Sequence, residues 1–241
     1  MIEKPIVELK NVSKIYKMGE VEVKAVNNVS LQIFSKEFVA IMGASGSGKS
    51  TMMHLIGALD LPTKGEISIN KSKLNNYTED QLAELRGKTI GFVFQDFNLI
   101  NTLSAFENVR LPVLFQDEEN ENIYNKRCTN LLDIVGLKDR LNHKPTELSG
   151  GQQQRVAIAR SLANDPEIIL GDEPTGALDS KSSKEIIDLF KKLNKSGKTI
   201  IIITHDKNIA INAKRIITLK DGKIIEDKIN KEKKWNNYSD L

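Results

Sequence analysis

The sequence predicts an α/β fold whose core is a mainly parallel sheet, joined to an antiparallel β subdomain and interrupted by an α-helical insertion. Short apolar runs such as 199–204, which holds four consecutive isoleucines, alternate with amphipathic helical segments, as expected for parallel strands covered on both faces. Before residue 38, apolar and polar residues alternate with the period of half-buried antiparallel strands. Between about 96 and 150, apolar residues recur mainly at helical spacing.

The chain has 241 residues and is expected to form a single domain. Its expected parts are an α/β core with its antiparallel subdomain at about 1–95 and 151–230, a helical subdomain at about 96–150, and a polar tail at 231–241.

The first part of the chain is expected to be rich in strands. Apolar residues from Val7 onward alternate with charged ones, and the same alternation recurs in 21–25 and 29–33, so three half-buried antiparallel strands are expected. Tyr16 falls between the first two strands. It is either a strand-end aromatic that covers the core or a ring on which a base can stack. The apolar run 38–42 that follows has the length of a buried strand.

A glycine-rich segment follows that run and matches G-x-x-x-x-G-K-[ST] at every fixed position. Its residues are Gly43, Ala44, Ser45, Gly46, Ser47, Gly48, Lys49 and Ser50, with Thr51 as a second hydroxyl beside them. Apolar residues then recur at helical spacing, so the loop lies between a strand and a helix. In that context the backbone N–H groups and the helix N-terminus bind phosphates, Lys49 reaches the β- and γ-phosphates, and Ser50 ligates Mg²⁺. A Gly/Ser-rich surface loop would not need both flanks, so we expect a nucleoside triphosphate site.

The elements after this loop alternate between strand and helix. The patterns predict strands at 65–69, 89–94, 168–170 and 199–204, helices at 81–86, 104–136 (with a break at 111–112), 152–163 and around 186–193, and a hairpin joining 216–219 to 223–226. The hairpin turn is Asp221-Gly222. Cys128 lies on the apolar face of a helix and is expected to pack in the core.

Four positions each follow the carboxyl end of a predicted strand: Gly43, Gln95, Asp172 and His205. Ligands of open α/β sheets bind at that edge, so these positions are expected to converge. Asp172 suits Mg²⁺ held through water, and Glu173 is the candidate for polarising the attacking water. His205 is a candidate for contacting the γ-phosphate. The alternative for Asp172 is a strand-ending acid, and that for His205 is a surface or packed side chain.

Composition limits the partners and the location. The formal net charge is +3, from 35 basic and 32 acidic side chains, which is too balanced to indicate binding to nucleic acid or to an anionic membrane surface. Cys128 is the only cysteine, so no intrachain disulfide can form and a reducing cytoplasm fits. Apolar runs stop at about five residues, far short of the ~20 needed to cross a bilayer, and no apolar signal segment is expected at the N-terminus. Any membrane role is therefore expected to act through another subunit.

The ordered set of motifs resembles that of the ATP-binding-cassette (ABC) ATPases, and the match covers about residues 6–226. Residues 148–152 read LSGGQ, the signature of that family. The other matching positions are the phosphate loop at 43–50, Gln95, the strand and carboxylates at 168–173, the D-loop Ala177-Leu178-Asp179, the switch histidine His205 and the adenine-stacking aromatic Tyr16. The resemblance implies a P-loop NTPase (RecA-like) core and ATP hydrolysis with Mg²⁺ as cofactor.

The resemblance also implies a head-to-tail dimer, formed by two copies of the chain or by this chain and another ABC subunit. ATP would lie between the phosphate loop of one subunit and the signature of the other, which supplies Ser149, Gly150, Gly151 and Gln152. Ser149 to Gly151 open a helix and so offer a second anion site rich in N–H groups. Asp179 of the D-loop belongs to the expected nucleotide contacts. Gln95 is expected to sense Mg²⁺ and water and to pass the closure to a transmembrane permease, which places the chain peripherally on the cytoplasmic face of the cell membrane.

Within that family, residues 91–100 and 142–145 resemble the branch that serves lipoprotein-releasing, macrolide-exporting and antimicrobial-peptide-resistance systems. Export or extraction of a lipoprotein, peptide or antibiotic is therefore expected. Gly171 stands where many relatives have alanine, and no functional consequence is expected because the neighbouring carboxylates are intact.

The motifs are shared by proteins with two other uses of ATP. An ABC ATPase that regulates cell-wall or division machinery through a membrane partner would share all of them, so this alternative stays open. A soluble ATPase acting on DNA or ribosomes fits less well. DNA-repair relatives insert a very long coiled coil where this chain has about 100 residues between phosphate loop and signature, and ribosome-acting relatives carry two cassettes.

Overall fold

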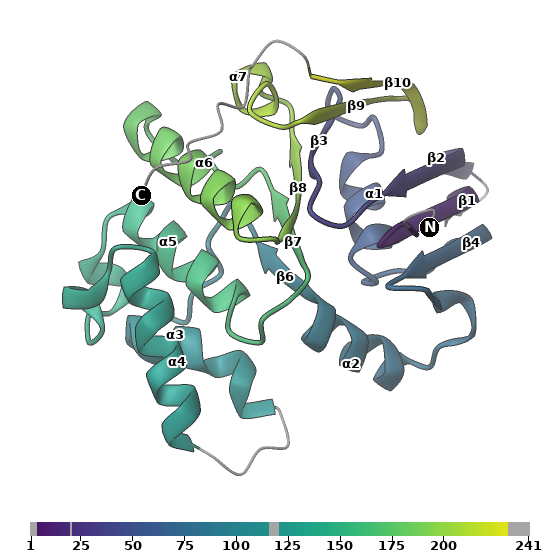
Figure 1. Ribbon diagram of the computed structural model, residues 1–241. Coiled ribbons are helices and arrows are strands. Elements are labelled where there is room, and N and C mark those ends of the chain that lie inside the picture. The colour runs from purple at the N-terminus through teal and green to yellow at the C-terminus, as the bar shows by residue number, and fades with distance from the viewer. Residues whose placement is uncertain (1–3, 20, 116–120, 231–241) are drawn as a thin grey trace.

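The computed structural model describes residues 4–19, 21–115 and 121–230, which form two sheets and a set of helices (Figure 1). The polar tail expected at 231–241, with Trp235 and Tyr238, lies outside the described residues.

The central sheet has six strands in the order β10-β9-β3-β8-β7-β6. They are β3 (Phe38–Met42), β6 (Ile90–Val93), β7 (Ile168–Asp172), β8 (Thr199–Thr204), β9 (Arg215–Lys220) and β10 (Lys223–Ile229). Every neighbouring pair is parallel except β9 and β10, which form the expected hairpin. All six residues of β8 are buried, and it pairs with β3 on one side and β7 on the other. The mainly parallel core predicted from its isoleucines is thus confirmed.

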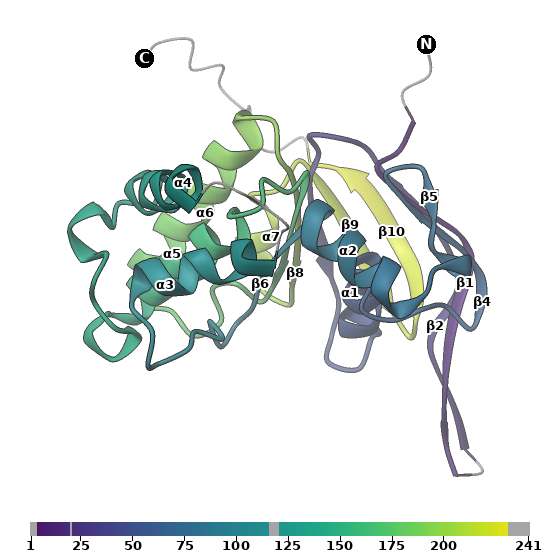
Figure 2. The same ribbon diagram turned by 90° about the horizontal axis from the view of Figure 1, so that it is seen from below.

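The second sheet is antiparallel and has the order β2-β1-β4-β5. Its strands are β1 (Val7–Met18), β2 (Val21–Ile33), β4 (Lys64–Ile69) and β5 (Ser72–Lys73). Figure 2 shows β1 and β2 extending past the rest of the molecule as a long hairpin.

Three expectations for this sheet are wrong. The segments 21–25 and 29–33 belong to one strand, β2, and Tyr16 lies within β1 rather than between strands. Val21 and Val23 are 63% and 43% exposed rather than half-buried. The reason is that this end of the β1–β2 hairpin extends past the rest of the molecule, so residues 21–24 are exposed on both faces of the strand (Figure 2).

The helices lie on both faces of the central sheet. They are α1 (Lys49–Ile56), α2 (Glu79–Thr89), α3 (Ala105–Arg110), α4 (Glu121–Ile134), α5 (Gly150–Ser161), α6 (Ser180–Lys195) and α7 (Lys207–Ala210), with 3-10 turns η1 (Leu74–Asn76), η2 (Leu111–Phe115), η3 (Lys138–Arg140) and η4 (Pro145–Glu147). The predicted break at 111–112 is the turn η2. Helix α7 was missed because four residues are too few for a periodic signal.

Two apolar cores lie on opposite faces of the central sheet, because alternate side chains of each strand point to opposite faces. Val39 and Ile41 join the core that holds α1 and the antiparallel sheet, whereas Phe38 and Ala40 join the core of α3 to α6. Cys128 is fully buried in the second core, as predicted, and burial raises the pKa of its thiol. Helices α1 and α5 therefore lie on opposite sides of the sheet (Figure 1).

Candidate functional site

The phosphate loop joins β3 to α1 with a backbone that needs glycine. Gly46 and Gly48 have φ values of 75° and 99°, in the left-handed region that other residues avoid. Gly48 is the N-cap of α1, and no side chain caps the helix there. The orphan N–H groups of the first turn are thus left for a ligand.

The walls of this loop fit closely around it. A Cβ atom at Gly48 would lie 2.2 Å from the carbonyl oxygen of Ala25, and one at Gly43 would lie 2.5 Å from that of Leu219. Lys49 donates from Nζ to the carbonyl oxygen of Ala44 at 2.8 Å, so its ammonium lies over the loop. The loop is a backbone-lined cradle suited to phosphate oxygens.

Glu173 is presented by a strained turn just past the end of β7. Its φ is 44°, and its backbone N–H donates to Ile203 of the neighbouring strand. Its carboxylate accepts from the hydroxyl of Thr204 at 2.9 Å and from the backbone N–H of His205 at 2.9 Å, and it lies 2.6 Å from Nδ1 of His205. A left-handed backbone at a non-glycine residue is costly, and the surrounding structure must stabilise it. The contacts with Thr204 and His205 hold the carboxylate in one orientation. Sequence reasoning missed Thr204, although a hydroxyl at the end of an isoleucine run was a signal.

Asp172 is the last residue of β7 and directly precedes Glu173. Its carboxyl interacts with the charge of Glu173 and with that of Lys49 in the phosphate loop. Burial raises the pKa of its carboxyl, and the neighbouring charge of Glu173 adds to this, while His54 and Lys49 act in the opposite sense. A carboxylate whose charged form is disfavoured gains from a nearby cation. Within the described residues, no three acidic, histidine or cysteine side chains gather as a metal site. A cation at Asp172 would need phosphate oxygens and water to complete its shell.

Gln95 is exposed and packs against Gly176, where a Cβ atom would lie 3.0 Å from its side-chain carbonyl carbon. The loops on both sides of this contact are held by Gln154 of α5, which sequence reasoning missed. Gln154 is fully buried, and its Nε2 donates to the carbonyl oxygens of Phe94 at 3.2 Å and Pro174 at 2.6 Å. An amide on the apolar face of a helix was the available signal.

Helix α5 also holds the continuation of the Gln95 loop. Phe97 and Asn98 both have positive φ, and their carbonyl oxygens accept from the guanidinium of Arg160 at 2.8 and 2.6 Å. Burial lowers the pKa of that guanidinium, which nonetheless stays charged. Helix α5 therefore holds the backbone of the Gln95 loop just before Gln95, at Phe94, and just after it, at Phe97 and Asn98.

The signature residues begin α5. Ser149 is its N-cap and forms a capping box with Gln152: the Ser149 hydroxyl accepts from the Gln152 N–H, and Gln152 Oε1 accepts from the Ser149 N–H. Gly150 and Gly151 occupy the first turn. A Cβ atom at Gly151 would lie 2.8 Å from the hydroxyl of Ser182, the second serine past the D-loop. This helix start lies on the face of the sheet opposite α1, so one chain does not join the signature to its own phosphate loop (Figure 1).

Asp179 of the D-loop is the N-cap of α6. Its carboxylate accepts from the backbone N–H groups of Lys181 and Ser182 and from the Ser182 hydroxyl at 2.7 Å. These bonds, led by that hydroxyl, lower the pKa of its carboxyl. In the single chain Asp179 thus serves as a helix cap.

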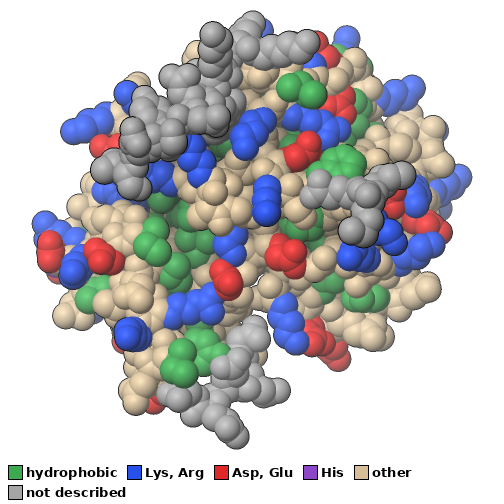
Figure 3. All heavy atoms as spheres, viewed as in Figure 1, with side chains coloured by type: hydrophobic (Ala, Val, Ile, Leu, Met, Phe, Trp, Pro, Cys, Tyr) green, Lys and Arg blue, Asp and Glu red, His purple; other side chains and the backbone are tan. Residues whose placement is uncertain are grey.

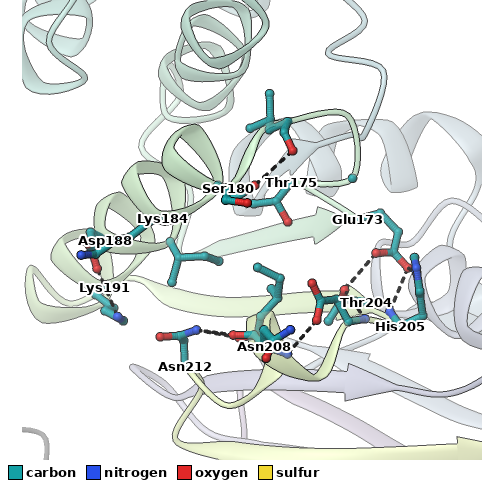
Figure 4. Close-up of a pocket in the computed structure, with 16 residues that line it drawn as sticks. Glu173, Thr175, Ser180, Lys184, Asp188, Lys191, Thr204, His205, Asn208 and Asn212 are labelled. Atoms are coloured by element: carbon teal, nitrogen blue, oxygen red, sulfur yellow. Dashed lines mark hydrogen bonds and ion pairs between the residues drawn. The ribbon is translucent and has the colours of Figure 1, made fainter.

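A cavity of about 610 Å³ opens beside the Glu173 and His205 pair. Figure 4 shows these two residues with Thr204 at one end, and Lys184, Asp188 and Lys191 of α6 toward the other. Asn208 and Asn212 line the α7 side. The Glu173 carboxylate is therefore among the groups that line this cavity.

The surface carries both signs of charge. Lysines, arginines and acids are interspersed over the face in Figure 3, in keeping with the near-balanced composition. In the ranges that the structure describes, every helix is too short or too polar to cross a membrane.

Comparison with known proteins agrees with this geometry. The family model described as ABC transporter matches residues 26–176. The chain is 54% identical over 227 residues to MJ0796 of Methanocaldococcus jannaschii, an uncharacterized ABC transporter ATP-binding protein, covering 91% of this chain and 95% of that one. It is 50% identical over 232 residues to the macrolide export ATP-binding/permease protein MacB of Hyphomonas neptunium, covering 95% of this chain but 35% of MacB.

Among solved structures, the dimer of MJ0796 in a post-hydrolysis state with ADP and Pi superposes with a TM-score of 0.85, at 52% identity, over 93% of this chain and 98% of that one. CbiO1 of Clostridium perfringens, part of the transporter complex cbiONQ, gives a TM-score of 0.86 at 30% identity.

Proposed function

Because the chain belongs to the ABC transporter family and is an ATP-hydrolysing subunit, we propose that two copies bind ATP head to tail and that Glu173 activates the attacking water. The observation that carries this proposal is the edge of the central sheet. There the phosphate loop follows β3, and Glu173 and His205 follow β7 and β8, on adjacent strands. A base two strands from the phosphate cradle, at the same edge of the sheet, suits phosphoryl transfer to water.

The residues present fit ATP with Mg²⁺. Gly43 to Ser50 form a cradle that Cβ atoms would fill, and α1 begins without a side-chain cap. Ser50, Gln95 and Asp172 would hold Mg²⁺, and Thr51 lies next to Ser50. When bound, the ion neutralises charge on the phosphate oxygens. The protein's own part is to orient: Lys49 binds phosphate, Glu173 accepts the proton of the water, and His205 contacts the γ-phosphate.

The second subunit closes the site. The start of α5, with Ser149, Gly150, Gly151 and Gln152, faces away from its own phosphate loop, which supports a role in the partner's site. Its free N–H groups add donors to the γ-phosphate. Asp179 caps α6 beside this helix start and would line the same interface. Two such contacts related by a two-fold axis make two composite sites.

A side chain that orients the base gives the first prediction. Thr204→Val keeps the shape of a buried residue but removes the hydroxyl that donates to Glu173. We expect kcat to fall about tenfold, as for the loss of a hydrogen bond to a charged group, with KM for ATP within about twofold. Thr204→Ser, which keeps the hydroxyl, should stay near wild type. Equal kcat values for the valine and serine variants would contradict this role.

The ATPase cycle acts on a membrane permease. A groove beside the Gln95 loop would bind this permease. The groove has a volume of about 370 Å³ and a mainly apolar lining, formed by residues such as Leu59, Phe92, Phe94 and Pro112, with Arg86 and Arg160 among its polar members. Leu59 is 45% exposed and lines this apolar groove, where a partner would cover it. The groove adjoins Phe94, so closure sensed at Gln95 reaches it directly.

The substance moved is proposed to be a lipoprotein, peptide or antibiotic that is exported or extracted, while this subunit acts at the cytoplasmic face of the membrane. Support comes from the 50% identity to MacB proteins named for macrolide export, in which an ATP-binding part and a permease share one chain. The present chain spans about a third of such a protein.

The test uses the permease encoded beside this chain's gene, produced together with it. Leu59→Glu should lower recovery of the complex, and the stimulation of ATP turnover by the permease, about tenfold or more, as for a central contact. The turnover of the isolated subunit should not change. Ile225→Glu is the matched control, because Ile225 is 61% exposed on β10 and away from the groove. If both variants bind the permease equally, the groove is not the docking site. If wild type recovers no membrane protein, the transport role fails.

A further inference from the structure

We propose that Asp60 is a positioning residue for the nucleotide base: it holds the ring of Tyr16 at the angle and height at which adenine stacks. This inference rests on the proposed role of Tyr16 as the stacking aromatic. It goes beyond that role by assigning the residue that fixes the orientation of the ring. The positioned ring then determines how much of the nucleotide-binding free energy comes from the base.

The contacts around Asp60 converge on its two oxygens. Tyr16 donates from its hydroxyl to Oδ2 at 3.1 Å. Lys14 donates from Nζ to Oδ1 at 2.5 Å, and the N–H of Leu61 donates to the same atom at 2.8 Å. Lys14 also donates to the carbonyl oxygen of Leu61 at 2.9 Å. The Tyr16 hydroxyl is thus bonded to a carboxylate that is itself held from two other directions.

The ring of Tyr16 has one face occupied. Lys14 and Tyr16 are two apart on β1, and both side chains reach the Asp60 carboxylate. The Lys14 ammonium lies over the ring, 5.2 Å from its centroid. A cation on one face leaves the other for a flat base, and the bond to Asp60 stops the ring from turning out of that arrangement.

The ring is also at the right distance from the phosphate loop. Tyr16 pairs with Val23 of β2, and two residues further along β2 the carbonyl oxygen of Ala25 abuts Gly48. Two residues of strand span about 7 Å, and the step between strands adds about 5 Å. A base joined through ribose to phosphates at Gly48 bridges a separation of this order.

Asp60 reaches this position through α1. The phosphate loop leads into α1, and Asp60 follows the end of that helix, where its backbone N–H donates to His54. One short rigid element therefore connects the phosphate cradle with the anchor of the base platform. Burial acts to raise the pKa of the Asp60 carboxyl, but hydrogen bonds from Lys14 and Tyr16 outweigh it and the pKa is lowered. The anchor is charged at neutral pH.

The competing explanation is that Asp60 only ties β1 to the segment after α1 through its ion pair with Lys14. A ligand that lacks the base separates the two. ADP and pyrophosphate both occupy a phosphate site and are not hydrolysed, but only ADP carries adenine. A positioning role changes ADP affinity alone, whereas a damaged fold or phosphate loop changes both.

The experiment measures Kd for ADP and for pyrophosphate, with Mg²⁺, by calorimetry on wild type, Asp60→Ala, Tyr16→Phe and the double variant. We expect Asp60→Ala to weaken ADP about fivefold and pyrophosphate less than twofold, a share of the stacking contribution of an aromatic residue. Tyr16→Phe removes the same bond from the other side, so Asp60→Ala should add less than about twofold in that background. Glu66→Ala is the matched control, since it breaks an ion pair with Lys73 in the same sheet.

Each other outcome contradicts either the positioning role of Asp60 or the stacking role of Tyr16. Equal weakening of ADP and pyrophosphate, or an undiminished effect of Asp60→Ala in the Tyr16→Phe background, overturns the positioning role. Tyr16→Ala is measured beside them. If it weakens ADP and Asp60→Ala does not, Tyr16 keeps its role and Asp60 loses it. If Tyr16→Ala has no effect on ADP, the stacking role itself fails. Should Asp60→Ala not fold, Tyr16→Phe alone tests the bond by the ratio of the two Kd values.

Discussion

Replacing Glu173 with glutamine is expected to lower ATP turnover by about a hundredfold to ten-thousandfold, the range for loss of a general base, while ATP still binds. Glutamine preserves size, and its one amide oxygen can still accept from Thr204 or from the backbone N–H of His205, but the amide cannot take a proton from water. The phosphate loop is untouched by the change. Phosphate release measures the turnover, and ATP-dependent dimer formation should become visible by size-exclusion chromatography because closed dimers no longer hydrolyse their ATP.

Glu185→Gln is the control for this substitution. Glu185 is a carboxylate on α6 that pairs with Arg155 at 2.8 Å, away from the sheet edge. Its variant should turn over ATP at the wild-type rate. Wild-type turnover by Glu173→Gln would remove Glu173 from the role of base.

Mixing two inactive variants is expected to restore activity. Lys49→Ala removes the phosphate-loop ammonium, and Ser149→Arg places a bulky cation at the start of α5. Either variant alone should fall about a hundredfold or more below wild type, because each of its two composite sites has a defect. In a mixed dimer both defects fall in one site and the other site is intact. An equal mixture should therefore recover roughly a quarter of wild-type turnover, since half of its dimers are mixed and each has one working site.

The dependence on mixing ratio is the sharp measurement. Turnover should peak at equal amounts and vanish at either end. The control mixes Lys49→Ala with a chain that carries both substitutions, which leaves no intact site at any ratio. If the first mixture is no more active than its components, the two chains do not share their sites.

The sequence predicted the parts of the site that depend on strand ends. Asp172, Glu173 and His205 follow buried apolar runs, and such runs pair in parallel with a common carboxyl edge, so their meeting place follows from topology. The glycine-rich loop was equally readable, because only glycine permits the positive φ at Gly48. The parallel core and the antiparallel sheet follow from periodicity.

The residues missed by sequence reasoning act through contacts between distant segments. Asp60 meets Tyr16 across 44 positions, Gln154 meets Phe94 across 60, and Thr204 meets Glu173 across 31. Each is a common polar residue in a common context, and its partner is set by packing. The errors over Val21 and Val23 have a similar origin, since the extension of the β1–β2 hairpin past the rest of the molecule (Figure 2) is a property of the tertiary structure and leaves no mark in the alternation.

The hydrogen bonds from α5 to the Gln95 loop have a consequence for how the loop can vary in sequence. All four oxygens that Gln154 and Arg160 hold, on Phe94, Pro174, Phe97 and Asn98, belong to backbone carbonyls. These four bonds do not depend on the side chains of Phe94, Phe97 and Asn98. Replacing those side chains to suit a new membrane partner would leave the four bonds in place, so that surface residues of the loop could change while α5 keeps hold of its backbone.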